Sequence, residues 1–277
     1  MSPNLFQSPQ YQRRKRRRNQ KNKKLRPRRK MERMREKKRR KRRMSKHIKR
    51  LASPVTWKQP RKKFTWSVRS RAGPHSLRTS VPLMVVVRDV LKFADTSKEA
   101  RNIISKGKVE VDGKVVKDYQ RPVGFMDILS VKEAGVAKRV LMDKKGILVL
   151  ADLGPQEVGW KLVKVTGKSI AKGGKIQIST HDGRVILTSE KGVKRGDTLK
   201  IGIPDQKILE VYPMAKETSV YVTGGAHKGT ITTIKEINVS RSYQENTVES
   251  NDNFTTTMSN VFVLGKSKGE ISIPGGV

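Results

Sequence analysis

The side chains best suited to chemistry in this sequence lie in a short polar segment, residues 97–108. Lys98, Arg101, Asn102 and Lys106 recur there at three- and four-residue spacings, which places them on the outer face of a helix. Such side chains donate hydrogen bonds to phosphate oxygens and attract polyanions through their charge. A run of charges is also the ordinary solvated surface of a helix, so the segment alone leaves both interpretations open.

Two helices are predicted to position these side chains. Residues 83–93 form the first, because their apolar side chains repeat at helical spacing. Thr96 and Glu99 have the spacing of a capping box, in which each side chain satisfies a backbone amide at the start of the second helix. Gly107 is suited to end that helix, because glycine adopts the left-handed conformation at little cost.

A β-hairpin with an Asp112-Gly113 turn is predicted next, followed by a closing strand at residues 127–129. The order helix, capped basic helix, hairpin and strand resembles the S4-type RNA-binding module of ribosomal proteins. This resemblance implies an RNA contact face on the second helix and the turn after it. The implied contact residues are Lys98, Arg101, Asn102, Lys106 and Lys108, with Arg88 and Lys92 beside them.

Composition points to the same class of partner. The 277 residues carry 63 Lys and Arg against 24 Asp and Glu, a formal net charge of +39. A polyanion would relieve the resulting self-repulsion, and nucleic acid is favoured over an anionic membrane because the cations share no helix with a bulky apolar face. The absence of cysteine excludes disulfides and thiolate chemistry. No apolar run has the length of a transmembrane helix or of a signal peptide.

The first 43 residues are predicted to be a separate, disordered basic extension. They contain too few apolar side chains to offset the entropy of ordering, although residues 28–43 suit a helix when bound to RNA. Met44 resembles a natural start. Residues 1–43 are therefore either a true extension or a consequence of a misassigned start site.

Residues 44–80 interleave basic and aromatic side chains. The stretch His47–Pro54, followed by Trp57, resembles the N-terminus of the S4e family of small-subunit ribosomal proteins. Packing of Trp57 and Trp66 in a small core is favoured over stacking on RNA bases, and the charges remain available for phosphate. The candidate RNA-binding residues are Lys46, Lys49, Arg50, Lys58, Arg61, Lys62, Lys63, Arg69 and Arg71.

Residues 139–212 are predicted to form an all-β domain of short strands separated by turns. Residues 172–175 and 181–184 match the central domain of the same family. A phosphate-binding loop at Gly173-Gly174 is rejected, because a strand and not a helix should follow it. His181-Asp182 suggests acid–base chemistry, but a hairpin turn is favoured. RNA contacts by Lys175 and Arg184 remain a hypothesis.

Residues 219–237 resemble the KOW motif, a strand–loop–strand element of small SH3-like barrels. Thr232 replaces a glycine of that pattern, and an ordinary glycine-rich hairpin is the alternative. The resemblance implies that the loop residues His227 and Lys228 touch RNA. Residues 260–265 are expected to close the barrel, so that 213–277 form the last domain.

The predicted fold is therefore α+β and multidomain: a disordered extension, an N-terminal segment to residue 80, the RNA-binding module (81–138), an all-β domain and an SH3-like barrel. The four histidines lie far apart and match no catalytic or metal-binding spacing, so we predict neither an enzyme nor a cofactor, metal or small-molecule site. The resemblance implies a cytoplasmic small-subunit protein, archaeal in type, that binds ribosomal RNA beside neighbouring ribosomal proteins. A free RNA chaperone or translation factor is the alternative, and a membrane-surface or polyanion binder would leave the motifs unexplained.

Overall fold

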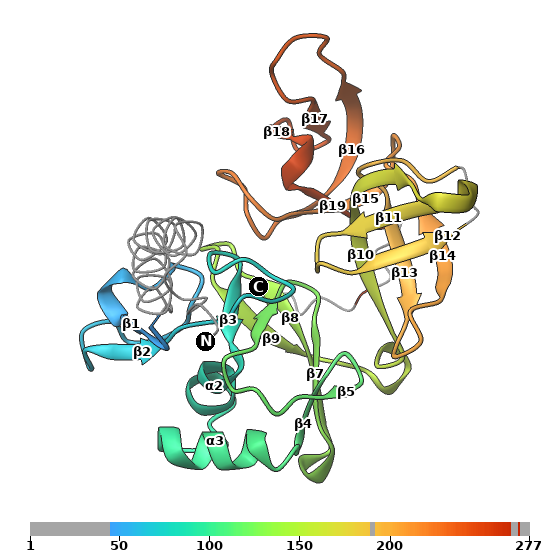
Figure 1. Cartoon of the computed structure of the whole chain (residues 1–277). Helices are drawn as coiled ribbons and strands as arrows, with labels where there is room; N and C mark the ends of the chain where they lie inside the picture. Colours follow the sequence, from blue (N-terminus) through green and yellow to red (C-terminus); the bar gives the residue numbers. More distant parts are fainter. Residues whose placement is uncertain (1–44, 189–191, 267–270, 272–277) are drawn as a thin grey trace, which may run out of the picture. The chain divides into compact units, whose positions relative to one another are not determined.

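The computed structural model describes residues 45–188, 192–266 and 271 (Figure 1). From Lys46 onward these residues belong to one compact unit. Expectations for the basic extension 1–43 lie outside the described residues. Every strand pair in the described part is antiparallel, and the helices there are short.

The N-terminal segment forms a two-stranded ribbon of β1 (His47–Lys49) and β2 (Trp66–Val68). Trp57 is 3% exposed, and its indole N–H donates to the Ser80 carbonyl at 2.6 Å. Trp66, in contrast, is 52% exposed. The expectation that both rings pack into a core is therefore wrong for Trp66, whose side chain lies on the outer face of the ribbon.

The helical part of the module agrees with its local sequence signals in most respects. Helix α2 (Leu83–Val85) continues as a π-helical turn over Val86–Val90, so the predicted helix ends three residues early, before Lys92 with its positive φ of 56°. Helix α3 (Ser97–Ser105) begins with the predicted Thr96–Glu99 capping box. Gly107 has a φ of +76° just beyond the end of α3, as expected for a helix stop.

A five-stranded sheet lies next to these helices (Figure 1). Asp112 and Gly113 both have positive φ and form the predicted hairpin turn. The expected domain boundary at residue 139 falls inside β8, because β8 and β9 pair with this sheet and not with the central one. The strands are, in spatial order, β5 (Lys114–Val115), β4 (Val109–Val111), β7 (Ile128–Val131), β8 (Val136–Met142) and β9 (Leu148–Asp152). Beside it, β3 (Ser80–Pro82) pairs with β6 (Pro122–Gly124).

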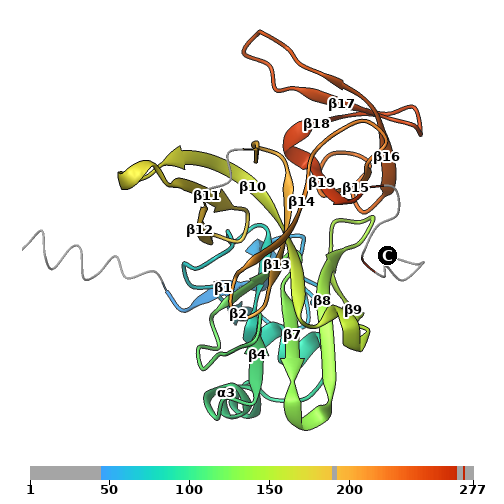
Figure 2. The same ribbon diagram turned by 90° about the vertical axis from the view of Figure 1, so that its right-hand side faces the viewer.

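The central sheet is built around the long strand β10 (Figure 2). The first half of β10 pairs with β13 and its second half with β11, so that one strand links both halves of this sheet. A strand follows Gly173-Gly174, in agreement with the rejection of a phosphate-binding loop. The spatial order is β12 (Val185–Thr188), β11 (Ile176–Thr180), β10 (Trp160–Ile170), β13 (Thr198–Gly202) and β14 (Ile208–Tyr212).

The C-terminal sheet shares its core with the helical module. Phe125 of the module stacks on Tyr221 at 5.4 Å between ring centroids and meets Phe262 edge-on at 5.2 Å. The central domain has a separate small core of aliphatic residues. The C-terminal strands are, in spatial order, β18 (Thr255–Thr257), β17 (Thr247–Ser250), β16 (Ile231–Asn238), β15 (Ser219–Val222) and β19 (Val261–Gly265).

Candidate nucleic-acid interface and its supporting junction

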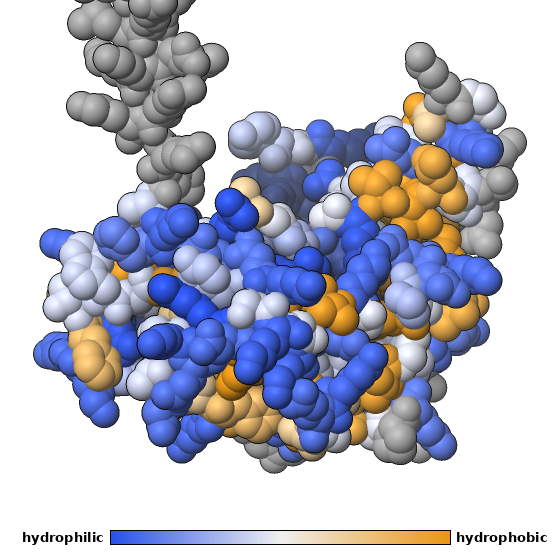
Figure 3. Space-filling view, turned by 60° about the horizontal axis from the view of Figure 1, so that its bottom comes forward, coloured by the Kyte–Doolittle hydropathy of each residue, from blue (hydrophilic) through white to orange (hydrophobic). Residues whose placement is uncertain are grey.

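Helix α3 presents one polar face to solvent, because its apolar face is anchored in the core. Ala100 and Ile104 are fully buried and Ile103 packs against the same core, whereas Arg101 and Asn102 between them are exposed. The face that carries α3 is turned toward the viewer in Figure 3, where hydrophilic residues cover most of the surface. The exposed predicted residues on this helix and at its end are Lys98, Arg101, Asn102 and Lys106.

Two of the predicted cations, Arg101 on α3 and Lys108 after it, are oriented by neighbouring groups. The Arg101 guanidinium lies 4.7 Å from the centre of the Tyr119 ring, and the Lys108 ammonium lies 2.6 Å from the Glu133 carboxylate. Both side chains keep contact with solvent, so these interactions orient the charge without burying it. The α3 face is therefore a partly fixed array of donors, which is the geometry needed for contact with a phosphate backbone.

The structure distributes the remaining predicted cations over three surfaces. Lys175 lies in the turn before β11, and Lys92 lies in the connection between the two helices. Arg71 pairs with Asp118 at 3.1 Å on an exposed surface. In the N-terminal segment the exposed cations are Lys46, Lys49, Lys58, Lys62, Lys63 and Arg71, while Arg61 and Arg69 are half-buried.

Three predicted contact residues have structural roles that sequence did not reveal. Arg50 is 3% exposed, donates to the carbonyls of Trp66 and Pro60, and lies over the Phe64 ring.

Arg184 forms ion pairs with two buried carboxylates, and Arg88 pairs with its neighbour Asp89 at 2.8 Å. The guanidinium groups of Arg50 and Arg184 thus contact acceptors of this chain, which gives both residues a role in the fold.

The glycine-rich loop between β15 and β16 packs against the chain itself. A Cβ on Gly229, whose φ is +73°, would lie 2.6 Å from the Lys144 backbone nitrogen in the β8–β9 turn. The ring of His227 is exposed and stacks on Phe254 at 4.2 Å, and Lys228 is half-buried beside Gly146. The close approach made possible by Gly229 is thus to a backbone of the same chain, and His227 remains at the surface.

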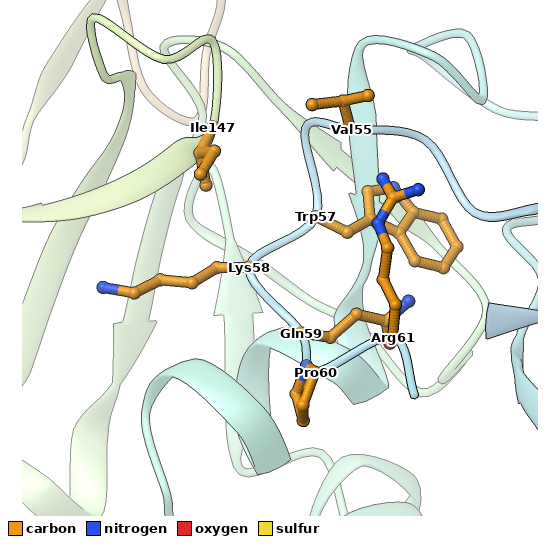
Figure 4. A pocket seen from close by; sticks show the side chains of 7 residues that line it. All are labelled: Val55, Trp57, Lys58, Gln59, Pro60, Arg61 and Ile147. Atoms are coloured by element: carbon orange, nitrogen blue, oxygen red, sulfur yellow. The ribbon is translucent and has the colours of Figure 1, made fainter. Parts of the chain in front are cut away.

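An open apolar groove of about 480 Å³ lies beside the N-terminal segment. Figure 4 shows the Lys58 side chain pointing away from Trp57 and Arg61, with Ile147 across the gap. The groove is lined by Val55, Trp57, Lys58, Gln59, Pro60, Arg61 and Ile147. Its walls are mainly aliphatic and aromatic.

A buried ionic cluster joins the module to the central domain. The Lys161 ammonium of β10, fully buried, lies 2.8 Å from Asp112, 3.1 Å from Asp127 and 2.7 Å from Asp182. Arg184 adds contacts to Asp112 and Asp182. We call His75, Asp112, Asp127, Lys161, Asp182 and Arg184 the junction cluster.

The junction cluster has the carboxylate geometry of a cation site, with the ammonium of Lys161 as the cation. Three carboxylates whose oxygens lie within 4.8 Å of one another would repel strongly without a central positive charge. Their attraction outweighs burial and raises the pKa of Lys161, while Lys161 and its neighbours hold the pKa of Asp182 at about 2 and depress that of Asp127. Lys161, Asp127 and Asp182 are therefore charged at neutral pH, and their ion pairs hold the fold together.

Two histidines that lie 106 positions apart in sequence meet beside this cluster, with ring centroids 6.0 Å apart. His75 pairs with Asp127 at 2.9 Å through Nε2. The Nδ1 atom of His181 accepts from the Lys164 amide at 3.1 Å, which leaves Nε2 to donate to the Phe125 carbonyl at 3.2 Å. His181 is therefore the neutral Nε2–H tautomer, and burial lowers its pKa to about 4.

This depressed pKa predicts a loss of stability on mild acidification. In the unfolded chain His181 would titrate near 6.5. Between about pH 6.5 and pH 4 the unfolded chain therefore binds more protons than the folded protein. The free energy of unfolding decreases as the pH is lowered through this range, by roughly 3 kcal/mol in total. The variant His181→Gln keeps an acceptor and a donor but does not titrate. We expect its urea midpoint to fall less over this range than that of the unaltered protein, and parallel pH profiles would contradict the assignment.

Strand β10 also fixes the C-terminal sheet through a second lysine. The Lys164 ammonium donates to the carbonyls of Met258, Ser259 and Val261 at 2.9, 2.8 and 2.6 Å. Burial is the main cause that lowers its pKa, to about 8. Because Lys161 and Lys164 are three residues apart on a strand, they point to opposite faces, and β10 links the module on one side to the C-terminal sheet on the other.

Comparison with known proteins places this architecture in a family. Residues 81–129 match the S4 domain, residues 42–78 match the RS4NT domain and residues 137–208 match the ribosomal family S4e. The fold and the surface thus define a protein built around an S4 domain and tied to a central β domain. No helix among the described residues combines the length and apolarity needed to cross a membrane.

Curated relatives extend the match over most of the chain. The small ribosomal subunit protein eS4 of Methanothermobacter thermautotrophicus is 45% identical over 235 residues, 83% of this chain and 97% of the relative. That of Picrophilus torridus is 42% identical over 226 residues, covering 82% and 96%. The crystal structure of the 30S ribosomal protein S4e from Thermoplasma acidophilum matches with a TM-score of 0.61 and 38% identity, over 68% of this chain and 96% of that one. The chain belongs to the ribosomal family S4e.

Proposed function

We propose that this protein is a structural constituent of the small ribosomal subunit, in the cytoplasm, and that it binds small-subunit ribosomal RNA without catalysing a reaction. The observation that carries the proposal is the 45% identity to a small ribosomal subunit protein across nearly all of that relative. The net charge of +39 supports a polyanionic partner. Neighbouring small-subunit proteins are proposed as further partners.

The proposed mechanism is multivalent contact with the RNA backbone. The α3 face supplies one set of cations and the N-terminal segment a second, each able to make weak contacts that add through tethering. The junction cluster supports this mechanism because it ties the module carrying α3 to the central domain. With its internal geometry held in this way, the protein would fix RNA segments relative to one another during assembly.

We further propose that residues 213–277 form a KOW-type, SH3-like domain whose exposed loop touches RNA through His227 and Lys228. The five-stranded antiparallel sheet supports this proposal, as does the stacking of His227 on Phe254, which orients the ring at the surface. Lys175 is proposed as a separate backbone contact of the central domain.

The direct test is the protein content of purified small subunits. After a high-salt wash that removes loosely bound factors, intact-mass spectrometry of the extracted proteins is expected to show this chain in amounts equal to other subunit proteins. Its presence mainly in the soluble fraction, with none in the washed subunits, would instead favour a free RNA-binding factor.

A further inference from the structure

The outer face of the β1–β2 ribbon presents a largely exposed aromatic side chain. Trp66 is 52% exposed, and the His47 ring meets it edge-on at 4.7 Å between centroids. Lys49 lies directly opposite Trp66 in the strand register, so its side chain emerges on the same face. Ile48 and Ser67, the pair between, point toward the protein interior.

Trp57, in the same segment, differs from Trp66 because its indole is buried. Its ring is enclosed and its N–H is bonded to the Ser80 carbonyl. At Trp66 the backbone carbonyl accepts from Arg50 at 3.3 Å and the pairing with β1 fixes the position, while the ring contacts His47 and remains half exposed. The exposed Trp66 ring is therefore positioned by the paired strands and lies outside the hydrophobic core.

The positive charge in this segment indicates which kind of partner the Trp66 ring would bind. From residue 37 to residue 88 the chain contains no Asp or Glu, while Lys46, Lys49, Lys62 and Lys63 are exposed near the ribbon in sequence. Lysine is depleted from the cores of protein–protein interfaces, whereas aromatic rings among cations are the usual binding surface for single-stranded nucleic acid. Bases in a duplex are already stacked on one another, so only an unpaired base is available to the indole face.

We propose that Trp66 is a stacking site for an unpaired RNA base, with His47 supporting the ring edge and Lys49 contacting the adjoining phosphate. This inference rests on the proposed RNA-binding function and makes it more specific, because it assigns this surface to single-stranded RNA and not to a helix. The α3 face, with cations but few exposed rings, remains suited to a phosphate backbone.

The test compares the full chain with Trp66→Ala and Trp66→Phe in binding to a short single-stranded oligouridylate and to a duplex RNA of equal length. We expect Trp66→Ala to weaken single-strand binding by about tenfold and to leave duplex binding unchanged. Trp66→Phe, which keeps a ring, should retain most of the affinity. Tyr243→Ala removes a fully exposed aromatic residue elsewhere and serves as the matched control.

Equal single-strand affinity of Trp66→Ala and the unaltered protein would overturn the proposal, and so would an equal loss for the duplex. A photo-crosslinker placed at position 66 is expected to label RNA in assembled subunits, and labelling of a protein there would assign this surface to a protein neighbour. Failure of the unaltered protein to bind small-subunit ribosomal RNA would refute the proposed function itself. The results for the Trp66 variants test only the stacking site and not that function.

Discussion

Replacing Lys161 with methionine is expected to destabilise the protein severely. Methionine fills a similar volume, so the main change is the loss of the positive charge that three buried carboxylates share. Removing one partner of a buried ion pair costs about 3–5 kcal/mol, because the remaining charge is left uncompensated. That is a large fraction of a typical total stability of roughly 5–15 kcal/mol. We therefore expect Lys161→Met to unfold at much lower urea concentration or to fail to accumulate in folded form.

The appropriate control is Lys175→Met, which makes the same chemical change at an exposed position of the same domain and should shift the urea midpoint little. A second variant separates charge from packing. In the double variant Lys161→Met with Asp112→Asn, one of the uncompensated carboxylates is neutral, so the double variant should be more stable than Lys161→Met alone. A midpoint for Lys161→Met equal to that of the control would show that the junction cluster does not hold the domains together.

Local features of the module could be predicted because their determinants are neighbours in sequence. The capping box needs only Thr96 and Glu99, and the hairpin turn needs only Asp112 and Gly113, so two residues close in sequence decide each structure. The π-helical turn over Val86–Val90 carries no comparable signal. The sequence also did not predict that β8 and β9 belong to the sheet of the helical module. An alternating pattern indicates which face of a strand is apolar, but it does not indicate with which sheet the strand pairs.

The junction cluster could not be predicted because its members are brought together only by the tertiary fold. Asp112 and Asp182 each precede a glycine in a hairpin turn. Because aspartate is common in such turns, the turn alone accounts for these residues, and no separate role for their carboxylates is indicated by the sequence. One signal was present in the sequence. Lys161 shares one face of a strand with Val163 and Val165, a position that predicts a buried side chain. A lysine in line with buried valines requires buried counter-charges, and the strand pattern does not identify them.

The predicted RNA surface shows the same limit. Exposure of the α3 cations follows from helical periodicity, so Lys98, Arg101 and Lys106 could be placed from sequence. Arg50 lies in a segment without such periodicity, and nothing local showed that Pro60 and Trp66 would supply carbonyl acceptors for its guanidinium. Irregular segments therefore need the structure before a basic residue is counted as available for RNA.

Reversing Lys98, Arg101 and Lys106 to glutamate is expected to cause the largest loss of RNA affinity among surface variants. All three are exposed on a helix held by the buried Ala100 and Ile104, so the fold should survive the change. Each phosphate contact that is lost removes about one unit from the slope of log affinity against log salt concentration, so the slope should flatten by about three. The affinity for small-subunit ribosomal RNA should fall by at least about a hundredfold at low salt.

The matched control reverses Lys145, Lys207 and Lys235, which are exposed cations on other elements, and so makes the same change in net charge. If the α3 face contacts the backbone directly, the control triple should lose far less affinity and keep most of the salt slope, because distant charges are screened beyond about 10 Å. Filter binding over a series of salt concentrations measures both quantities. Equal losses for the two triples would show that net charge alone binds the RNA, and that α3 has no particular contact with it.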